Sequence, residues 1–166
     1  SSSSQSGRYA HKFAESDIQR RSGAAATDFA PAAFQAKVGF RYEPGPEPLF
    51  VQIDSERIKW VLNNLIENAI RYTPEGGNVR VTSIKMQDRV VIQVHDTGIG
   101  IPQQDRNNIF ERFYRAGNAI TKQNQGNGLG LYIARTIVKD HKGELTFASN
   151  QEGVGTTFTL TLPSAR

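Results

Sequence analysis

The feature that most constrains the fold is one long amphipathic stretch, DSERIKWVLNNLIENAIRYTPEGG, at residues 54–77 of this 166-residue chain. Its apolar residues recur at spacings of three and four, the pattern of a helix that buries one face. Asp54 or Ser55 can cap the start of this helix, and Pro74 ends it. The apolar stripe consists of Ile58, Val61, Leu62, Leu65, Ile66, Ala69 and Ile70. Such a stripe must be covered by other elements, because a single helix gains little stability from its own propensity.

Short segments elsewhere in the chain are candidates to cover this stripe. Apolar and polar residues alternate along them, which is the pattern of half-buried strands. The expected strands are residues 39–44, 49–53, 78–84, 89–96, 144–149 and 156–163. A second long helix is expected in LGLYIARTIVKDHKG, residues 129–143, where helical spacing returns. Strands combined with separate long helices predict an α+β fold, a two-layer sandwich in which helices cover one face of a mixed sheet.

The N-terminal part of the chain gives weaker signals. The opening SSSSQSG is a low-complexity segment, of a composition that is typical of flexible chain. A short helix is expected at residues 12–21, broken by SGAAAT at 22–27, and a second helix is expected to start near Pro31. The expected organisation is a flexible or poorly assigned segment at 1–29, followed by one domain at 30–166.

Composition and charge argue against several classes of protein. The chain has no cysteine, which excludes disulfides and thiolate metal sites, and its three histidines lack the spacing of zinc ligands. No apolar run approaches the ~18 residues of a membrane-spanning helix, and no signal-peptide pattern opens the chain. The net charge is +4, but basic and acidic residues are interleaved, which favours a solvated surface over a nucleic-acid-binding one. The P-loop pattern and the protein-kinase motifs are absent.

A polar line runs beside the apolar stripe of the first long helix. Asn64, Asn68 and Arg71 fall within a sector of roughly 60°, with Glu67 at its margin. Amide oxygens are suitable ligands for Mg²⁺, and a guanidinium offers forked donors to phosphate. The alternative is an ordinary solvated face with pairs four residues apart. Tyr72 could belong to the core or could line a pocket.

The segment HDTGIGIPQQ, residues 95–104, follows directly after an expected strand. Asp96 stands at the strand end, and Gly98 and Gly100 leave two positions without side chains. Glycine is used where the chain turns tightly or where something must come close. This segment is therefore either a strand-end turn or a surface in which a carboxylate and bare backbone face a flat ligand.

A second glycine cluster, QGNGLGL at residues 125–131, comes immediately before the second long helix. Gly126, Gly128 and Gly130 leave backbone N–H groups open, and the start of a helix adds positive potential. Both features favour an anion such as a polyphosphate. The alternative is a flexible loop with a helix start.

Four motifs in series resemble one known family. NNLIENAIRYTP, DTGIGIP, IFERFYR and GNGLGL occur in this order. They resemble the N, G1, F and G2 boxes of the ATP-binding catalytic domain of sensor histidine kinases. That domain belongs to the GHKL superfamily, together with DNA gyrase, MutL and the heat-shock chaperone ATPases. The similarity covers about residues 30 to 163, and the closing GVGTTFTLTLP also resembles the last strand of the family.

The resemblance implies the Bergerat-type α/β sandwich, with a mobile lid over ATP and Mg²⁺. It implies that Asn68 binds the Mg²⁺ ion with help from Asn64, and that Arg71 contacts phosphate near Tyr72. Asp96 would accept a hydrogen bond from the adenine 6-amino group. A guanine would instead present a carbonyl to this carboxylate, which favours ATP over GTP.

The glycine motifs and the lid receive roles from the same resemblance. Gly98 and Gly100 would let the backbone pass close to the base. The end of the lid would lie over the triphosphate, Phe110 and Phe113 would anchor the lid, and Arg115 would reach the γ-phosphate. The residues implied at the end of the lid are Gly126, Gly128, Leu129 and Gly130.

One position separates members of the superfamily that hydrolyse ATP from the kinases. Hydrolytic members carry a glutamate one turn before the metal-binding asparagine, as a base for water, and this chain has Asn64 there. An amide cannot take up a proton, and Glu67 points elsewhere on the helix. Phosphoryl transfer to a protein histidine, by positioning and charge neutralisation, is therefore expected, with little ATP hydrolysis.

The acceptor histidine and the partners are expected outside this chain. His11 is followed by Lys12 rather than by an acidic residue, so a surface role is expected for it, and His95 is expected to be structural or at the rim of a pocket. The partners implied are a histidine-bearing dimerisation domain and a response regulator, without nucleic acid. A cytoplasmic domain of a membrane-anchored parent kinase is expected. The alternative function is a nucleotide-binding regulatory or interaction module without turnover.

Overall fold

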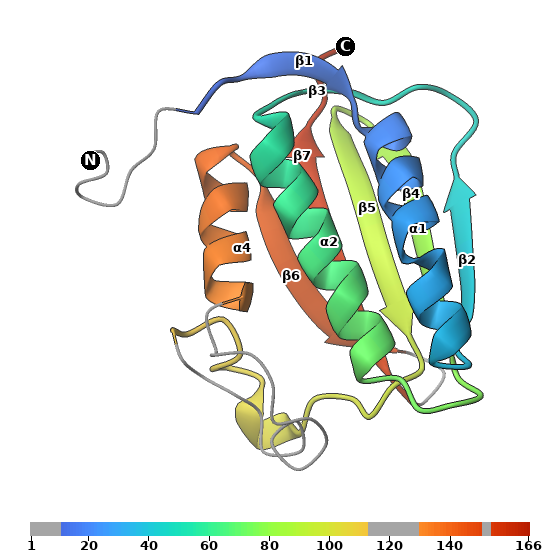
Figure 1. Cartoon of the computed structure of the whole chain (residues 1–166). Helices are drawn as coiled ribbons and strands as arrows, with labels where there is room; N and C mark the ends of the chain where they lie inside the picture. The colour runs from blue at the N-terminus through green and yellow to red at the C-terminus, as the bar shows by residue number, and fades with distance from the viewer. Residues whose placement is uncertain (1–10, 113–129, 151–153) are drawn as a thin grey trace.

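The computed structural model describes residues 11–112, 130–150 and 154–166. Its helices and strands follow one another along the chain as labelled in Figure 1. They are β1 Ala14–Asp17, α1 Ile18–Gln35, β2 Gly39–Pro44, β3 Phe50–Ile53, α2 Ser55–Arg71, β4 Asn78–Met86, β5 Arg89–Asp96, the 3₁₀ helix η1 Gln103–Asp105, α4 Gly130–Asp140, β6 Glu144–Ser149 and β7 Thr156–Pro163. The expected strands and both long helices are therefore present, with ends that differ by a few residues.

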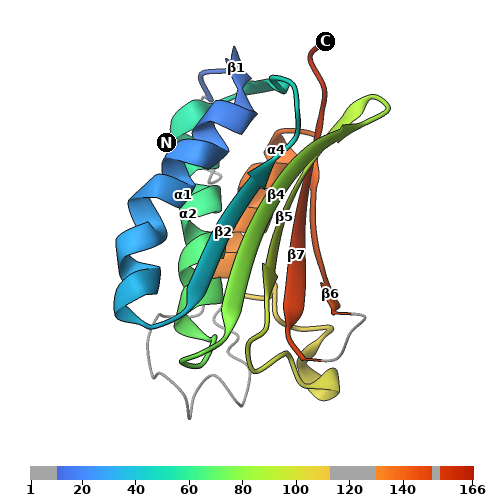
Figure 2. The ribbon, with the colours of Figure 1, turned by 90° about the vertical axis from the view of Figure 1, so that its right-hand side faces the viewer.

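Five of these strands form one sheet in the order β2-β4-β5-β7-β6. β2 pairs in parallel with β4, and the other neighbours are antiparallel. α1, α2 and α4 cover one face of this sheet, as the edge-on view in Figure 2 shows. The expected fold class, a mixed and mostly antiparallel sheet with helices on one face, is confirmed.

The α2 helix forms the centre of the core. All of its predicted stripe residues are buried, and the stripe packs over the inward-facing residues of the sheet. In β5 the buried positions alternate with half-buried ones, so Val90, Ile92 and Val94 point toward the helices. Asp96 ends this alternation, and its carboxylate therefore lies on the helix side of the sheet. The register of a single strand thus brings a charged group under α2.

The N-terminal region differs from the sequence prediction. Residues 18–35 form one continuous helix, with neither a break at 22–27 nor a new start at Pro31, which lies inside it. Small residues make this possible, because they let α1 pack closely against the rest of the domain. A Cβ on Gly23, for example, would lie 3.3 Å from the Tyr42 ring. The boundary expected between residues 29 and 30 falls inside this helix.

The start of α1 is also fixed by other segments of the same domain. One oxygen of the Asp17 carboxylate accepts hydrogen bonds from the backbone N–H of Gln19 at 3.0 Å and of Leu49 at 2.9 Å. β1 pairs with β3 in a separate two-stranded sheet, and Ile18 is completely buried. The described residues from Ala14 onward therefore belong to the folded domain. None of the helices in the described ranges combines the length and apolar character needed to cross a bilayer.

Candidate nucleotide-binding site

Three elements that carry predicted site residues meet at one end of the domain. The loop after β5 lies against the end of α2, where the Ile99 N–H donates to the Tyr72 carbonyl at 3.2 Å. The start of α4 lies against the middle of α2, since a Cβ on Gly130 would be 2.9 Å from the Asn64 amide nitrogen. This end is the lower one in Figure 1. The fold therefore brings the first glycine motif, and Gly130 of the second, to the polar line of α2.

The two oxygens of the Asp96 carboxylate have different surroundings. Oδ1 accepts hydrogen bonds from the backbone N–H of Gly98 at 2.8 Å and of Thr156 at 3.2 Å. Oδ2 has no such partner among the residues that the structure describes. The residue as a whole is only 8% exposed, and Oδ2 keeps a small contact with solvent. The arrangement fixes the carboxylate by one oxygen and leaves the other available as an acceptor.

Burial raises the pKa of Asp96, and the two hydrogen bonds from Gly98 and Thr156 partly oppose that rise. No ion pair joins Asp96 to a cation in the described part of the chain. A second anion next to this carboxylate would be unfavourable, and a neutral group that donates a hydrogen bond would be favourable. The electrostatics therefore suit a neutral donor such as an aromatic amino group.

The polar line on α2 is held only by long hydrogen bonds. The Asn68 amide donates to the Asn64 oxygen at 3.4 Å, and Arg71 donates to the Asn68 oxygen at 3.4 Å. These distances are near the outer limit for a hydrogen bond, so neither amide oxygen is strongly engaged. Arg71 also pairs with Glu67 at 3.1 Å. Two weakly engaged amide oxygens one helical turn apart fit the oxygen ligands that Mg²⁺ requires.

The glycines of the first motif have distinct structural reasons. A Cβ on Gly98 would lie 2.6 Å from the Tyr72 carbonyl oxygen, so the loop reaches α2 only without a side chain here. Gly100 has a φ of +76°, a backbone conformation that side chains strongly disfavour. Both glycines are therefore explained by the shape of the loop itself.

Several predicted residues lie outside the described ranges. These residues are Phe113, Arg115, Gly126, Gly128 and Leu129. Phe110 is described, and it packs against the core beside Phe158, with ring centres 6.4 Å apart. The Arg135 guanidinium lies 4.9 Å from the centre of the Phe110 ring. Gly130 begins α4, as expected for the last glycine of the second motif.

Three residues that hold Asp96 from the other side, Thr156, Asn150 and Gly155, were not predicted as site residues. Thr156 donates to its carboxylate, and Asn150 donates from its amide nitrogen to the Asp96 carbonyl oxygen at 2.7 Å. Gly155 has a φ of +106°, and a Cβ there would overlap the same carbonyl oxygen. The GVGTT stretch at the start of the last strand was the available signal for Gly155 and Thr156. Nothing in the sequence pattern pointed to Asn150.

The histidines lie away from the Asp96 carboxylate or on the other face of the sheet. His11 was expected at the surface, but its side chain is only 7% exposed, and its Nε2 lies 3.1 Å from Asp140. His141 is buried beside it, with ring centres 5.3 Å apart. His95 Nδ1 lies 2.9 Å from the Thr157 hydroxyl. Its neighbours Val94 and Asp96 point toward the helices, so the His95 side chain points to the other face of the sheet. The structural role expected for His95 agrees with this contact.

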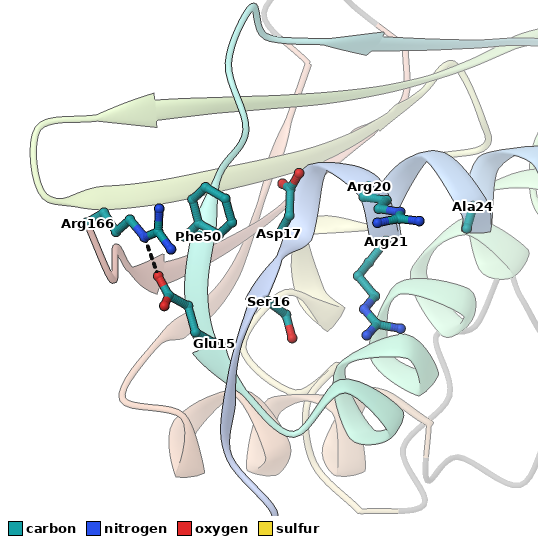
Figure 3. Close-up of a pocket in the computed structure, with 8 residues that line it drawn as sticks. All are labelled: Glu15, Ser16, Asp17, Arg20, Arg21, Ala24, Phe50 and Arg166. Carbon is teal, nitrogen blue, oxygen red and sulfur yellow. Dashed lines mark hydrogen bonds and ion pairs between the residues drawn. The ribbon is translucent and has the colours of Figure 1, made fainter.

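A cavity of about 610 Å³ lies at the opposite end of the domain, beside β1 and the start of α1. Figure 3 shows its lining, in which Arg166 pairs with Glu15 at 2.6 Å and lies over the Phe50 ring. The described residues that line it are Glu15, Ser16, Asp17, Arg20, Arg21, Ala24, Phe50 and Arg166. None of the predicted site residues in the described ranges is among them, so the motifs point to the Asp96 end instead.

Comparison with known proteins identifies the family. Residues 53–166 match the family described as histidine kinase-, DNA gyrase B-, and HSP90-like ATPase. The chain belongs to this family. The resemblance inferred from the four motifs is confirmed, and this ATPase-family match begins just before α2.

The relatives of this ATPase domain are sensor kinases. The chain is 45% identical over 117 residues to the sensor histidine kinase WalK of Bacillus subtilis (strain 168), covering 69% of this chain and 19% of WalK. The catalytic domain of the histidine kinase ThkA has a similar structure, with a TM-score of 0.81 and 30% identity over 92% of this chain and 95% of that chain. ThkA in complex with the response regulator TrrA matches with a TM-score of 0.77 and 29% identity, over 92% of this chain and 42% of that one. The chain thus spans about a fifth of WalK and corresponds to a histidine kinase catalytic domain.

Proposed function

We propose that this domain binds Mg²⁺·ATP and transfers the γ-phosphoryl group to a histidine on a separate dimerisation domain. The proposal rests on one observation, which is that the two oxygens of the Asp96 carboxylate are engaged differently. Its Oδ1 is engaged by two backbone N–H groups, and its Oδ2 is without a described partner in a buried setting. A site that binds a neutral base through a hydrogen bond from that base requires such an arrangement.

Adenine satisfies Oδ2, and guanine does not. The 6-amino group of adenine donates a hydrogen bond to the free oxygen of Asp96. Guanine and hypoxanthine carry a carbonyl at that position, which would place two acceptors face to face. Leaving such a buried acceptor unpaired costs about 1–3 kcal/mol. The site is therefore specific for the adenine base, and Tyr72 would lie beside the nucleotide.

The triphosphate would lie along the polar line of α2. Asn68 would hold the Mg²⁺ ion with Asn64 assisting, and Arg71 would donate to phosphate oxygens. When bound, the ion neutralises charge on the triphosphate. The backbone of Gly130 at the start of α4 favours an anion nearby. Arg115 is assigned to the γ-phosphate, and the glycines at 126 and 128 with Leu129 are assigned to the end of the lid.

Transfer rather than hydrolysis follows from Asn64. A base that activates water must accept a proton, and an amide does not do so at neutral pH. Asn64 lies one turn before Asn68 and next to Gly130, so the place where such a base would stand is filled by an amide. Catalysis then rests on positioning and charge neutralisation, and the acceptor histidine comes from another domain.

The partners proposed are the dimerisation domain of a longer kinase and a response regulator. The similarity to ThkA, which was crystallised with the response regulator TrrA, supports the second of these partners. We also propose a cytoplasmic location in a membrane-anchored parent kinase, because the chain is similar to the sensor histidine kinase WalK. Transfer is tested by mixing this chain with an isolated histidine-bearing dimerisation domain and labelled ATP. Acid-labile phosphate on that domain is expected, and binding without transfer would support the regulatory alternative instead.

Exchange of one atom at Asp96 tests the nucleotide site. In Asp96→Asn the side-chain oxygen can still accept from Gly98 and Thr156, while the amide nitrogen takes the place of Oδ2. The variant should therefore bind Mg²⁺·ATP about 30-fold more weakly, because two donors now face each other. It should bind ITP, which carries a 6-carbonyl, more tightly than the wild type does. Calorimetry with both nucleotides measures this, and an unchanged order of preference would refute the role of Asp96.

A further inference from the structure

Asn150 occupies a junction between three segments of the domain. It lies directly after β6, and its amide nitrogen donates to the carbonyl oxygens of Asp96 at 2.7 Å and Val154 at 3.0 Å. Its amide oxygen accepts from the Thr157 hydroxyl at 2.7 Å. One side chain therefore joins the end of β5, the turn before β7 and β7 itself.

The orientation of the Asn150 amide follows from its neighbours. Carbonyl oxygens of Asp96 and Val154 can only accept, so the NH₂ group must face them. The amide oxygen then faces Thr157 and can only accept, so the Thr157 hydroxyl hydrogen points toward Asn150. All three hydrogen bonds are satisfied in this orientation and in no other.

The same reasoning extends the chain of hydrogen bonds to His95. The single hydrogen of the Thr157 hydroxyl is used toward Asn150, so its oxygen accepts from His95 Nδ1 at 2.9 Å. Donors therefore run in one direction, from His95 to Thr157, from Thr157 to Asn150, and from Asn150 to Asp96. His95 and Thr157 are paired residues on neighbouring strands. The chain begins on the face of the sheet without helices and ends at the backbone of Asp96.

The geometry points to Asn150 as a positioning residue that holds the backbone of Asp96 so that its carboxylate keeps Oδ2 directed at the adenine base. The inference rests on the proposed function. Asp96 is the last residue of β5, and the chain turns away immediately after it. Its carboxylate is fixed through Oδ1 by Gly98 and Thr156, which lie on two different segments. The direction of Oδ2 therefore depends on how those segments are held together, and Asn150 is the side chain that binds them through the Asp96 carbonyl.

Gly155 makes this arrangement possible. A Cβ on Gly155 would overlap the Asp96 carbonyl oxygen and would lie 2.7 Å from the Asn150 amide nitrogen. The bare position lets the turn come close enough for the Asn150 amide to reach Asp96. The absence of a side chain at Gly155 thus leaves room for this hydrogen bond.

A ligand that lacks the 6-amino group separates positioning from general packing. Purine riboside 5′-triphosphate carries hydrogen in place of that group, so it gains nothing from Asp96 Oδ2. Asn150→Ala should raise the Kd for Mg²⁺·ATP about tenfold, and that for the purine nucleotide by less than about twofold. Calorimetry on the full 166-residue chain measures both. A residue with a merely structural role would weaken both nucleotides equally.

Two threonines on β7 provide a matched control. Thr157→Val removes the hydroxyl that orients Asn150 and should raise the Kd for ATP about threefold, with the purine nucleotide again unaffected. Thr159 lies on the same face two residues further on, where it accepts a hydrogen bond from Gln93. Thr159→Val should leave both affinities unchanged, because its hydroxyl has no link to Asp96.

A second measurement needs no nucleotide. The amide hydrogens of Gly98 and Thr156 bond to Asp96 Oδ1, so they should exchange with solvent about fivefold faster in Asn150→Ala. Equal weakening of both nucleotides, or no change in either affinity or exchange, overturns the inference while Asp96 keeps its proposed role. If the wild type binds ATP and the purine nucleotide equally, the proposed adenine site fails and the inference fails with it.

Discussion

The two ends of α2 differ in how fully their polar groups are hydrogen-bonded. At its start, the backbone N–H of Asp54 donates to His141 Nε2 at 3.0 Å. The Asp54 carboxylate accepts from the backbone N–H of Lys12 and caps the helix by accepting from the backbone N–H of Arg57. His141 in turn bonds to the Ile137 carbonyl at 2.8 Å. Polar groups at this end are engaged with one another across three segments of the chain.

At the other end of α2, the polar groups are only partly engaged. Asn64 and Asn68 share one bond of 3.4 Å, and Asp96 leaves one carboxylate oxygen without a described partner. A poorly solvated acceptor without a partner lowers stability, and a ligand can supply that partner. The comparison teaches that the starting end of α2 contributes to folding and that the finishing end is prepared for binding. Substitutions at the two ends should therefore separate stability from affinity.

The largest effect is expected at the folding end. His141→Ala removes the acceptor for the Asp54 N–H and leaves a cavity, so the free energy of unfolding should fall by about 3 kcal/mol. Urea denaturation measures this loss. The Kd for ATP should remain unchanged under conditions in which the variant is folded. A stable variant with weakened ATP binding would mean that the two ends are not separate.

A smaller effect is expected at the binding end. Asn68→Ala should weaken Mg²⁺-dependent ATP binding about a hundredfold, roughly 2.7 kcal/mol, while unfolding changes by less than about 1 kcal/mol. Titration calorimetry with and without Mg²⁺ gives the first value, and denaturation gives the second. Lys59→Ala is the control on the same helix, because Lys59 is exposed and lies on the side opposite Asn68. Comparable losses of affinity in both variants would contradict the assignment of Asn68.

The smallest effect is a dependence of stability on pH. Burial lowers the pKa of His141 and outweighs the hydrogen bond to the Ile137 carbonyl, which raises it. The nearby His11 also lowers the pKa, and Asp54 and Asp140 raise it. The folded state then binds fewer protons than the unfolded state below the ordinary histidine pKa of about 6.5. Stability should therefore fall as the pH drops from about 6.5 toward the lowered pKa. His141→Gln should reduce this slope, and His95→Gln should reduce it as well, because burial also lowers the pKa of His95. Thr159→Val removes no ionisable group and is the control.

Elements with a strong period were predicted correctly from the sequence. The stripe on α2 and the alternation in β5 depend on burial of every second or every third and fourth residue, which the residues themselves display. The α1 helix was predicted as two separate helices, because most of its buried residues are alanine and serine, which carry little apolar signal. Packing against neighbouring elements, as at Gly23, overrode the weak local propensity of that segment.

The candidate site was predictable only where a motif carried it. Asp96 and the asparagines of α2 stood in recognisable patterns. Asn150 did not, because its role arises from contacts with Asp96 and Thr157, which are 54 and 7 residues away. Likewise, His11 is paired with Asp140, 129 residues further along the chain. Contacts over such separations follow from the topology and leave no local trace.

The attachment of the C-terminus has a mechanical consequence. The Ala165 N–H donates to the Phe50 carbonyl at 2.7 Å, and Arg166 is paired with Glu15, so β3 and β1 hold the last residues. A pulling force applied between residues 14 and 166 would load these few bonds at one pole of the domain. The bonds that hold residues 165 and 166 would break before the force reached Asp96. Fusion partners joined at residue 14 or at residue 166 should therefore leave nucleotide recognition undisturbed.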